Sequence, residues 1–122
     1  MTHPRPAAYV HEACLSLGPD SDPAAPGAAV TVALCGTWEH GGPCRWSHRT
    51  APVRRIGPTL DVRILFVCDL AEERDLRSRI VTALAAGHLA GPGGESHWTL
   101  VAEEAGSLSA DEQVIGARLI AT

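Results

Sequence analysis

The stretch Leu60-Asp-Val-Arg-Ile-Leu-Phe-Val-Cys68 decides the fold, because it is the clearest strand signal in the chain. Both of its faces become apolar towards the end, which is typical of a strand in the centre of a sheet. Asp69 follows directly, and Glu72 stands three residues later, which is the spacing of a helix capping box. An apolar stripe with helical spacing then continues to Gly87 through Leu76, Ile80, Val81 and Leu84. The sequence therefore predicts a central strand that leads into an amphipathic helix.

Further elements are expected on both sides of this unit. Residues 9–17 and 28–38 are predicted strands, because apolar residues alternate within each, and the second is expected to pair antiparallel with the first. Residues 96–104 form a predicted fourth strand. Ser109 and Glu112 repeat the capping-box spacing and predict a terminal helix. Stretches rich in proline and glycine are expected to be irregular, namely residues 18–27, 51–60 and 87–94.

The order of these elements is β-β-β-α-β-α. This order predicts an α+β fold, a two-layer sandwich in which a mixed sheet of about four strands carries two helices on one face. If the third and fourth strands are parallel neighbours, the crossover between them should be right-handed. A length of 122 residues fits a single small domain, residues 1–122, with a Cys/His-rich loop inserted at residues 35–58. The residues do not identify a known family.

The inserted loop carries four potential metal ligands within fourteen residues: Cys35, His40, Cys44 and His48. Cysteine and histidine are rare enough in this chain that chance would place about one of them in such a window. The spacing Cys-x4-His-x3-Cys-x3-His differs from the common Cys-x2-Cys zinc signatures. A loop of this length in a small domain is nevertheless uncommon unless something holds it. We therefore predict zinc, because two thiolates and two neutral imidazoles balance its charge in a tetrahedral site.

Local backbone chemistry suggests how these ligands would meet. Pro43 is well placed to begin a short helix, on which Cys44 and His48 would share one face. Glycines before Pro43 allow the chain to fold back, which would bring His40 and Cys35 to the same ion. The other interpretation is that the cysteines are small buried hydrophobic residues and the histidines are solvated.

Arginines are concentrated around the same loop. Residues 37–56 carry four arginines against Glu39 alone, a local net charge of +3 in a chain whose net charge is −4. This segment predicts a patch that binds an anionic small molecule or an acidic protein, formed by Arg45, Arg49, Arg54, Arg55 and Trp46. The alternative is that these arginines are solvated and pair with distant carboxylates.

Composition limits the functional classes. With 14 acidic residues against ten arginines, general nucleic-acid binding is not expected. There is no apolar run of membrane-spanning length and no apolar core of a secretory signal at the N-terminus, so we expect a cytoplasmic protein without membrane association. A homo-oligomer is left open. Cys14 and Cys68 are expected to be buried, unreactive thiols, and His11 to be structural, because its neighbours in a strand point to the opposite face.

The leading functional prediction is a small zinc-binding module whose arginine-bearing loop contacts an anionic ligand or an acidic partner. The alternative is a small zinc enzyme. In that case three of the four ligands would hold the metal, and Glu39 would act as general base on a bound water.

Overall fold

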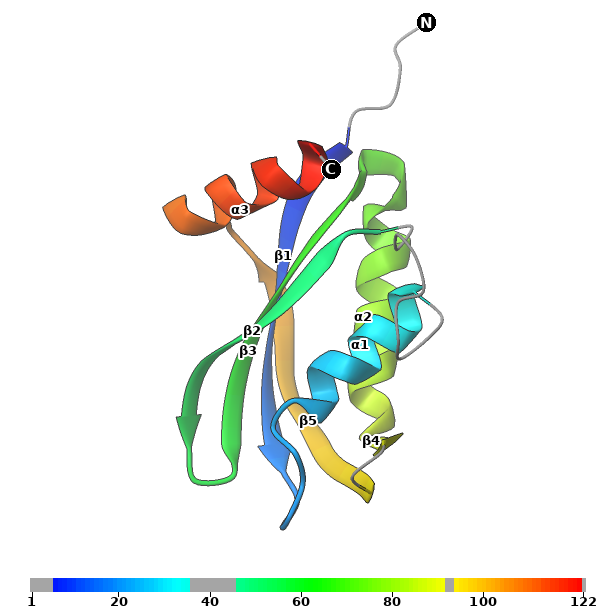
Figure 1. Ribbon diagram of the computed structural model, residues 1–122, viewed down its shortest axis with the longest axis vertical. Helices are drawn as coiled ribbons and strands as arrows, with labels where there is room; N and C mark the ends of the chain where they lie inside the picture. Colours follow the sequence, from blue (N-terminus) through cyan, green and yellow to red (C-terminus); the bar gives the residue numbers. More distant parts are fainter. Residues whose placement is uncertain (1–5, 36–45, 92–93, 122) are drawn as a thin grey trace, which may run out of the picture.

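The computed structural model describes residues 6–35, 46–91 and 94–121. Its strands and helices follow the chain as β1 Pro6–Leu17, α1 Ala25–Cys35, β2 His48–Ile56, β3 Thr59–Asp69, a 3-10 turn Leu70–Glu72, α2 Glu73–Ala86, β4 His88–Gly91, β5 Gly94–Gly106 and α3 Ala110–Ala121. The strands form one curled sheet in the order β2-β3-β1-β5-β4, and each neighbouring pair is antiparallel. Helices α1 and α2 lie on one side of this sheet, while α3 crosses the other side near one end (Figure 1).

The predicted sandwich with a four-stranded mixed sheet and two helices on one face is therefore wrong. The sheet has five strands, all antiparallel, and a third helix packs on the opposite face. The crossover expected between parallel neighbours is also absent from the described sheet, because β1 lies between β3 and β5. The long-range pairing that decides strand order leaves no local trace in the sequence.

Residues 28–38 form the largest local error, since most of this predicted strand lies in helix α1. The buried residues of α1 recur at helical spacing: Ala25, Pro26, Ala29, Val30 and Leu34. Asp22 marks the start, because its carboxylate accepts a hydrogen bond from the Ala24 N–H at 2.9 Å. Pro26 lies in the first turn of α1, where proline is tolerated. The prolines and glycines of residues 18–27 favour a loop locally, and the helix begins within their last three residues.

Residues 51–60 were expected to be irregular, yet they belong to the β2–β3 hairpin. Pro52 is tolerated in β2 because this strand lies at the edge of the sheet, where a missing N–H leaves no ladder bond unmade. Gly57 makes the tight turn with a φ of 58°. In the same way, the connector at residues 87–94 contains the short strand β4.

Two β-bulges explain why the sheet curls. The pairing of β1 with β5 shifts next to Cys14, where Val101 is the extra residue, and the pairing of β2 with β3 shifts at Val53. Both shifts lie at the same level, because Asp61 of β3 pairs with Cys14 on one side and with Arg54 on the other. A bulge bends its strand and increases the local twist. Two bulges at the same level therefore bend the whole sheet at that level.

The core lies between the inner face of the sheet and helices α1 and α2. Its fully buried side chains include Leu15, Leu60, Ile64, Phe66, Leu76, Ile80 and Leu84. Trp98 of β5 is also buried, and its indole N–H donates to the carbonyl oxygen of Leu84 in α2 at 2.8 Å. The predicted strand at 60–68, the helix that follows it and the capping box of Asp69 with Glu72 are confirmed.

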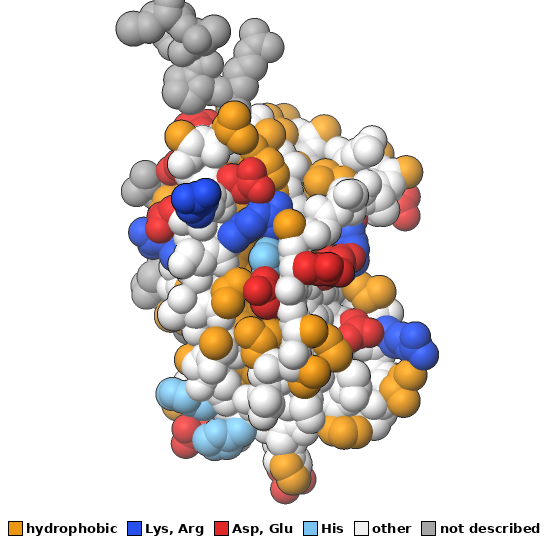
Figure 2. Space-filling view, turned by 180° about the vertical axis from the view of Figure 1, so that it is seen from behind, with side chains coloured by type: hydrophobic (Ala, Val, Ile, Leu, Met, Phe, Trp, Pro, Cys, Tyr) orange, Lys and Arg blue, Asp and Glu red, His pale blue; other side chains and the backbone are white. Residues whose placement is uncertain are grey.

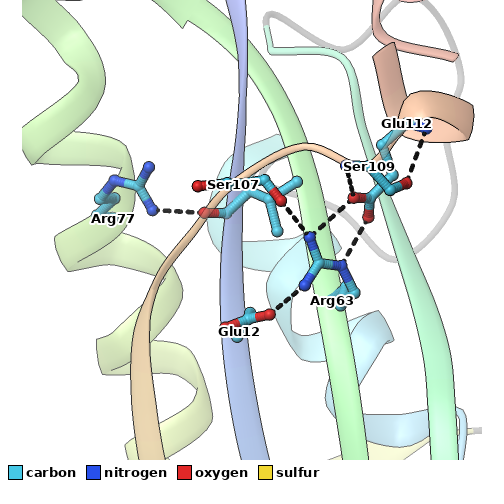
Figure 3. Close-up of polar contacts among 7 residues, drawn as sticks. Glu12, Arg63, Arg77, Ser107, Ser109 and Glu112 are labelled. Atoms are coloured by element: carbon cyan, nitrogen blue, oxygen red, sulfur yellow. Dashed lines mark hydrogen bonds and ion pairs between the residues drawn. The ribbon is translucent and has the colours of Figure 1, made fainter. Parts of the chain in front are cut away.

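Arg63 of β3 fixes α3 to the outer face of the sheet (Figure 3). Its guanidinium donates two hydrogen bonds of 2.8 Å to the carboxylate of Glu112 and also pairs with Glu12. A fourth contact is a hydrogen bond of 2.6 Å that Arg63 donates to the carbonyl oxygen of Ser107. Ser109 and Glu112 form the predicted capping box, with Ser109 N–H donating to Glu112 at 2.8 Å. The hydrogen bonds from Arg63, together with that from Ser109, lower the pKa of Glu112 to about 2.

We expect the carboxylate of Glu112 to make the free energy of unfolding depend on pH in the acidic range. The pKa of Glu112 is about 2 in the folded chain, against an ordinary value of 4.5. Its contribution is therefore complete above about pH 5 and is lost as the pH falls towards 2, with an upper limit of about 3 kcal/mol. Glu112→Gln should lower the free energy of unfolding at neutral pH and flatten its dependence on pH in this window. Urea unfolding between pH 2 and 7 measures both effects, and exposed Glu104→Gln is the control. An unchanged slope in Glu112→Gln would contradict the assignment.

Gly87 is a second position that the fold requires. It ends α2 in the left-handed region with a φ of 73°, and its carbonyl oxygen accepts a hydrogen bond from Trp98 N–H at 2.9 Å. A Cβ at this position would lie 2.6 Å from the Trp98 carbonyl oxygen. We therefore expect Gly87→Ala to destabilise the fold by about 2–3 kcal/mol, from backbone strain plus this clash.

Gly57→Ala is the matched control, because it shares the positive φ but a Cβ there meets nothing within 4 Å. It should destabilise the fold by about 1 kcal/mol. Urea unfolding of both variants tests the comparison. Equal losses of stability in the two variants would mean that the close contact with the Trp98 carbonyl oxygen adds nothing to the cost of Gly87→Ala.

Candidate functional site

Two of the four predicted metal ligands are described by the structure. Cys35 is the last residue of α1 and His48 the first residue of β2, and the distance from Cys35 Sγ to His48 Nδ1 is 3.8 Å. His40 and Cys44 lie outside the described residues. The end of a helix and the start of a strand therefore bring a sulfur and an imidazole nitrogen together from positions 13 residues apart. We refer to this pair as the Cys35–His48 corner.

The route to this proximity differs from the predicted one. His48 was expected to share a short helix with Cys44, but it begins strand β2. Successive residues of a strand point to opposite faces, and the contact of His48 with Thr31 of α1 shows that its side chain lies on the helix side. The neighbouring Arg49 therefore points away from the Cys35–His48 corner.

Both ring nitrogens of His48 have hydrogen-bonding partners. Nδ1 lies 3.0 Å from the Trp46 carbonyl oxygen, and Nε2 lies 3.0 Å from the hydroxyl of Thr31. With the proton on Nδ1, the ring donates to Trp46. With the proton on Nε2, it donates to Thr31, whose own hydroxyl donates to the Gly27 carbonyl oxygen at 3.2 Å. The second tautomer leaves a lone pair on Nδ1, the nitrogen nearest to Cys35.

The oxidation state of Cys35 controls what this corner can bind. Cys35 is disulfide-bonded in this structure, whereas Cys14 and Cys68 are free. Zinc is bound by a thiolate, so Cys35 must be reduced before it can act as a ligand. Within the described ranges, no group of three or more His, Cys, Asp or Glu side chains is arranged so that it could hold a metal ion without rearrangement.

The two free cysteines are in environments that oppose ionisation. Burial, followed by the charges of nearby carboxylates such as Glu72, raises the pKa of Cys68 to about 11. A hydrogen bond with Asp61 and burial raise the pKa of the Cys14 thiol. Both thiols therefore stay protonated at neutral pH, which agrees with the low reactivity expected for them, although only Cys68 is buried as expected and Cys14 is half-buried.

The predicted arginine patch is partly described. Arg49, Arg54 and Arg55 are exposed along β2, while Arg45 lies outside the described residues. Trp46, in contrast, is only 7% exposed. Its indole N–H donates to Glu72 at 3.3 Å, and the guanidinium of Arg79 lies 4.9 Å from its ring centroid.

Sequence reasoning missed a buried polar network around His11. His11 is 4% exposed; its Nε2 contacts the carboxylate of Glu103, and its Nδ1 lies 2.9 Å from an N–H of Arg77. Arg77 also donates to the Val10 carbonyl oxygen and to Glu73. Both ring nitrogens are occupied, so the network ties β1, β5 and α2 together, as expected for a structural histidine. No local signal could reveal it, because its partners are 66 and 92 residues away in sequence.

The chain matches no protein-family model, and searches of the curated proteins and of the solved structures return no significant match. None of the helices in the described part of the chain is long and apolar enough to cross a membrane.

Proposed function

We propose that this chain is a zinc-binding module in which Cys35 and His48 hold the ion together with His40 and Cys44. One observation carries the proposal, the 3.8 Å between Cys35 Sγ and His48 Nδ1. Zinc bonds of about 2.3 Å to sulfur and about 2.05 Å to nitrogen place two ligands of a tetrahedron about 3.6 Å apart. The corner is therefore within a few tenths of an ångström of the spacing that a shared ion needs.

The surroundings of His48 also support metal binding. A metal-bound imidazole usually donates its other N–H to an oxygen that fixes the ring orientation. Thr31 is placed for this role, since its hydroxyl lies 3.0 Å from His48 Nε2 and is itself oriented by Gly27. Binding through Nδ1 would displace the contact of Nδ1 with the Trp46 carbonyl oxygen.

The proposal includes a reducing environment, because Cys35 must be a thiolate. The cytoplasm provides such an environment. Oxidation of Cys35 would remove a ligand, so the metal and the disulfide exclude each other at this corner.

The arginines define the partner in this proposal, an anionic small molecule or an acidic protein surface. Arg49 and Arg54 pair with Leu65 and Asp61 of β3, which places them on the sheet face away from His48. The module would therefore hold its metal on one face and present positive charge on the other. The alternative of a zinc enzyme depends on Glu39, which lies outside the described residues.

We expect the reduced chain, prepared without a polyhistidine tag, to contain at least one zinc ion per molecule by elemental analysis. Cobalt in place of zinc should give the near-ultraviolet charge-transfer absorption of a thiolate–metal bond. Cys35→Ser and His48→Asn should each weaken zinc binding at least tenfold, because each removes one ligand. The oxidised chain should lose the thiolate–cobalt absorption.

Cys14→Ser is the control for this experiment, since it removes a free thiol outside the corner. It should leave zinc content and cobalt absorption unchanged. Absence of zinc from the reduced protein, or an equal loss in Cys14→Ser, would refute the proposal.

The partner surface is tested separately with a polyglutamate peptide as probe. Reversal of two charges in Arg49→Glu/Arg54→Glu should abolish binding while zinc content is retained, and the affinity of the unmodified chain should fall with added salt. Arg118→Glu in α3 is the control, because it changes an exposed arginine elsewhere. Isothermal titration calorimetry at two salt concentrations gives the affinities. Binding that survives the double reversal would show that these arginines do not form the partner surface.

A further inference from the structure

The β4–β5 hairpin presents two histidines and one glutamate on one surface. His88 of β4 and His97 of β5 are paired directly across the two strands, and their ring centroids are 6.5 Å apart. Glu95 lies two residues before His97 and therefore on the same face. One carboxylate oxygen of Glu95 is 3.8 Å from His88 Nδ1 and 3.7 Å from His97 Nε2. Figure 2 shows histidine side chains beside an acidic one near one end of the molecule.

These distances are close to those that a shared metal ion imposes. With bonds of about 2.1 Å, an oxygen and a nitrogen 3.7 to 3.8 Å apart would subtend an angle of about 125° at the ion. As the side chains lie they do not yet enclose an ion. All three are more than half exposed, so rotation about side-chain bonds can close the set without moving the core.

The backbone that carries the two histidines is held firmly. The N–H of His97 donates to the Ser21 hydroxyl, and its carbonyl oxygen accepts from the Gly18 N–H, each at 2.8 Å. His88 follows Gly87, whose carbonyl oxygen accepts from Trp98 N–H. Metal binding therefore has to order only side chains, because the strands that present them are already in register.

We propose that His88, Glu95 and His97 form a surface site for a divalent transition metal, with Ni²⁺, Cu²⁺ and Zn²⁺ as the matching ions. Two imidazoles and one carboxylate suit these ions, whereas Ca²⁺ and Mg²⁺ require oxygen ligands. Water molecules would complete the coordination. The site contains no sulfur, so it does not depend on the Cys35–His48 corner or on the redox state of Cys35.

The test uses the oxidised, tag-free chain and Ni²⁺ alone as the probe. Calorimetric titration measures affinity, and broadening of amide NMR signals by the paramagnetic ion locates it. We expect broadening centred on residues 88–91 and 94–98, and at least tenfold weaker binding in His88→Asn and in His97→Asn. Glu95→Gln should weaken binding several-fold, because a neutral amide is a poorer ligand than a carboxylate.

Glu104→Gln is the matched control, since it neutralises another exposed glutamate of β5 and should leave the affinity unchanged. Undiminished binding in His88→Asn, broadening centred elsewhere, or no binding at millimolar Ni²⁺ would overturn the proposal. Cys35→Ser separates the two sites. It should weaken cobalt binding at the corner at least tenfold and leave Ni²⁺ binding at the hairpin intact, so either site can fail while the other stands.

Discussion

The position of β1 in the middle of the sheet is the constraint on which the rest of the structure depends. This N-terminal strand is paired with β3 along most of its length and with β5 on its other side. Because β2 is antiparallel to β3, it runs parallel to β1, and parallel strands require a long crossover. Helix α1 belongs to that crossover, and its last residue, Cys35, lies beside the first residue of β2, His48. Strand order thus makes the proximity of Cys35 and His48 possible.

The parts of the fold that the sequence predicted correctly are those with local signals. Strand β3 and helix α2 were found because an apolar run is followed by the capping box of Asp69 and Glu72, and both signals lie within a few residues. Helix α1 was missed because Val30, Val32 and Leu34 occupy alternate positions, as in a strand, while the helical spacing of its buried residues is seen only in the folded chain. Strand β2 was missed because a proline such as Pro52 usually marks irregular structure. Proline is tolerated in an edge strand, but the edge position of β2 depends on long-range pairing that the local sequence does not show.

The candidate sites follow the same division. The Cys35–His48 corner was predictable because its residues cluster within one window of sequence, although the geometry that joins them was not the expected helix. The proposed hairpin site was not predicted, because residues 87–94 are rich in glycine and were expected to be irregular. Without strand β4, the pairing of His88 with His97 could not be expected. The alternation of Glu95 and His97 along one strand was its only local trace. The network around His11 has no local trace in the sequence, since it joins three elements that are far apart in the chain.

The two proposed metal-binding surfaces differ in the chemistry that would control them. A thiolate ligand at Cys35 is lost on oxidation, so occupancy there depends on the reducing power of the environment. An imidazole–carboxylate set is unaffected by thiol oxidation, and its occupancy would depend on the supply of free metal ion. The bulges that crease the sheet and the glycine at the end of α2 are backbone features that neither condition changes. The scaffold would then stay folded while each surface responds to its own signal, because Cys35 and His48 lie at element ends beside the core and the hairpin side chains lie on exposed strands.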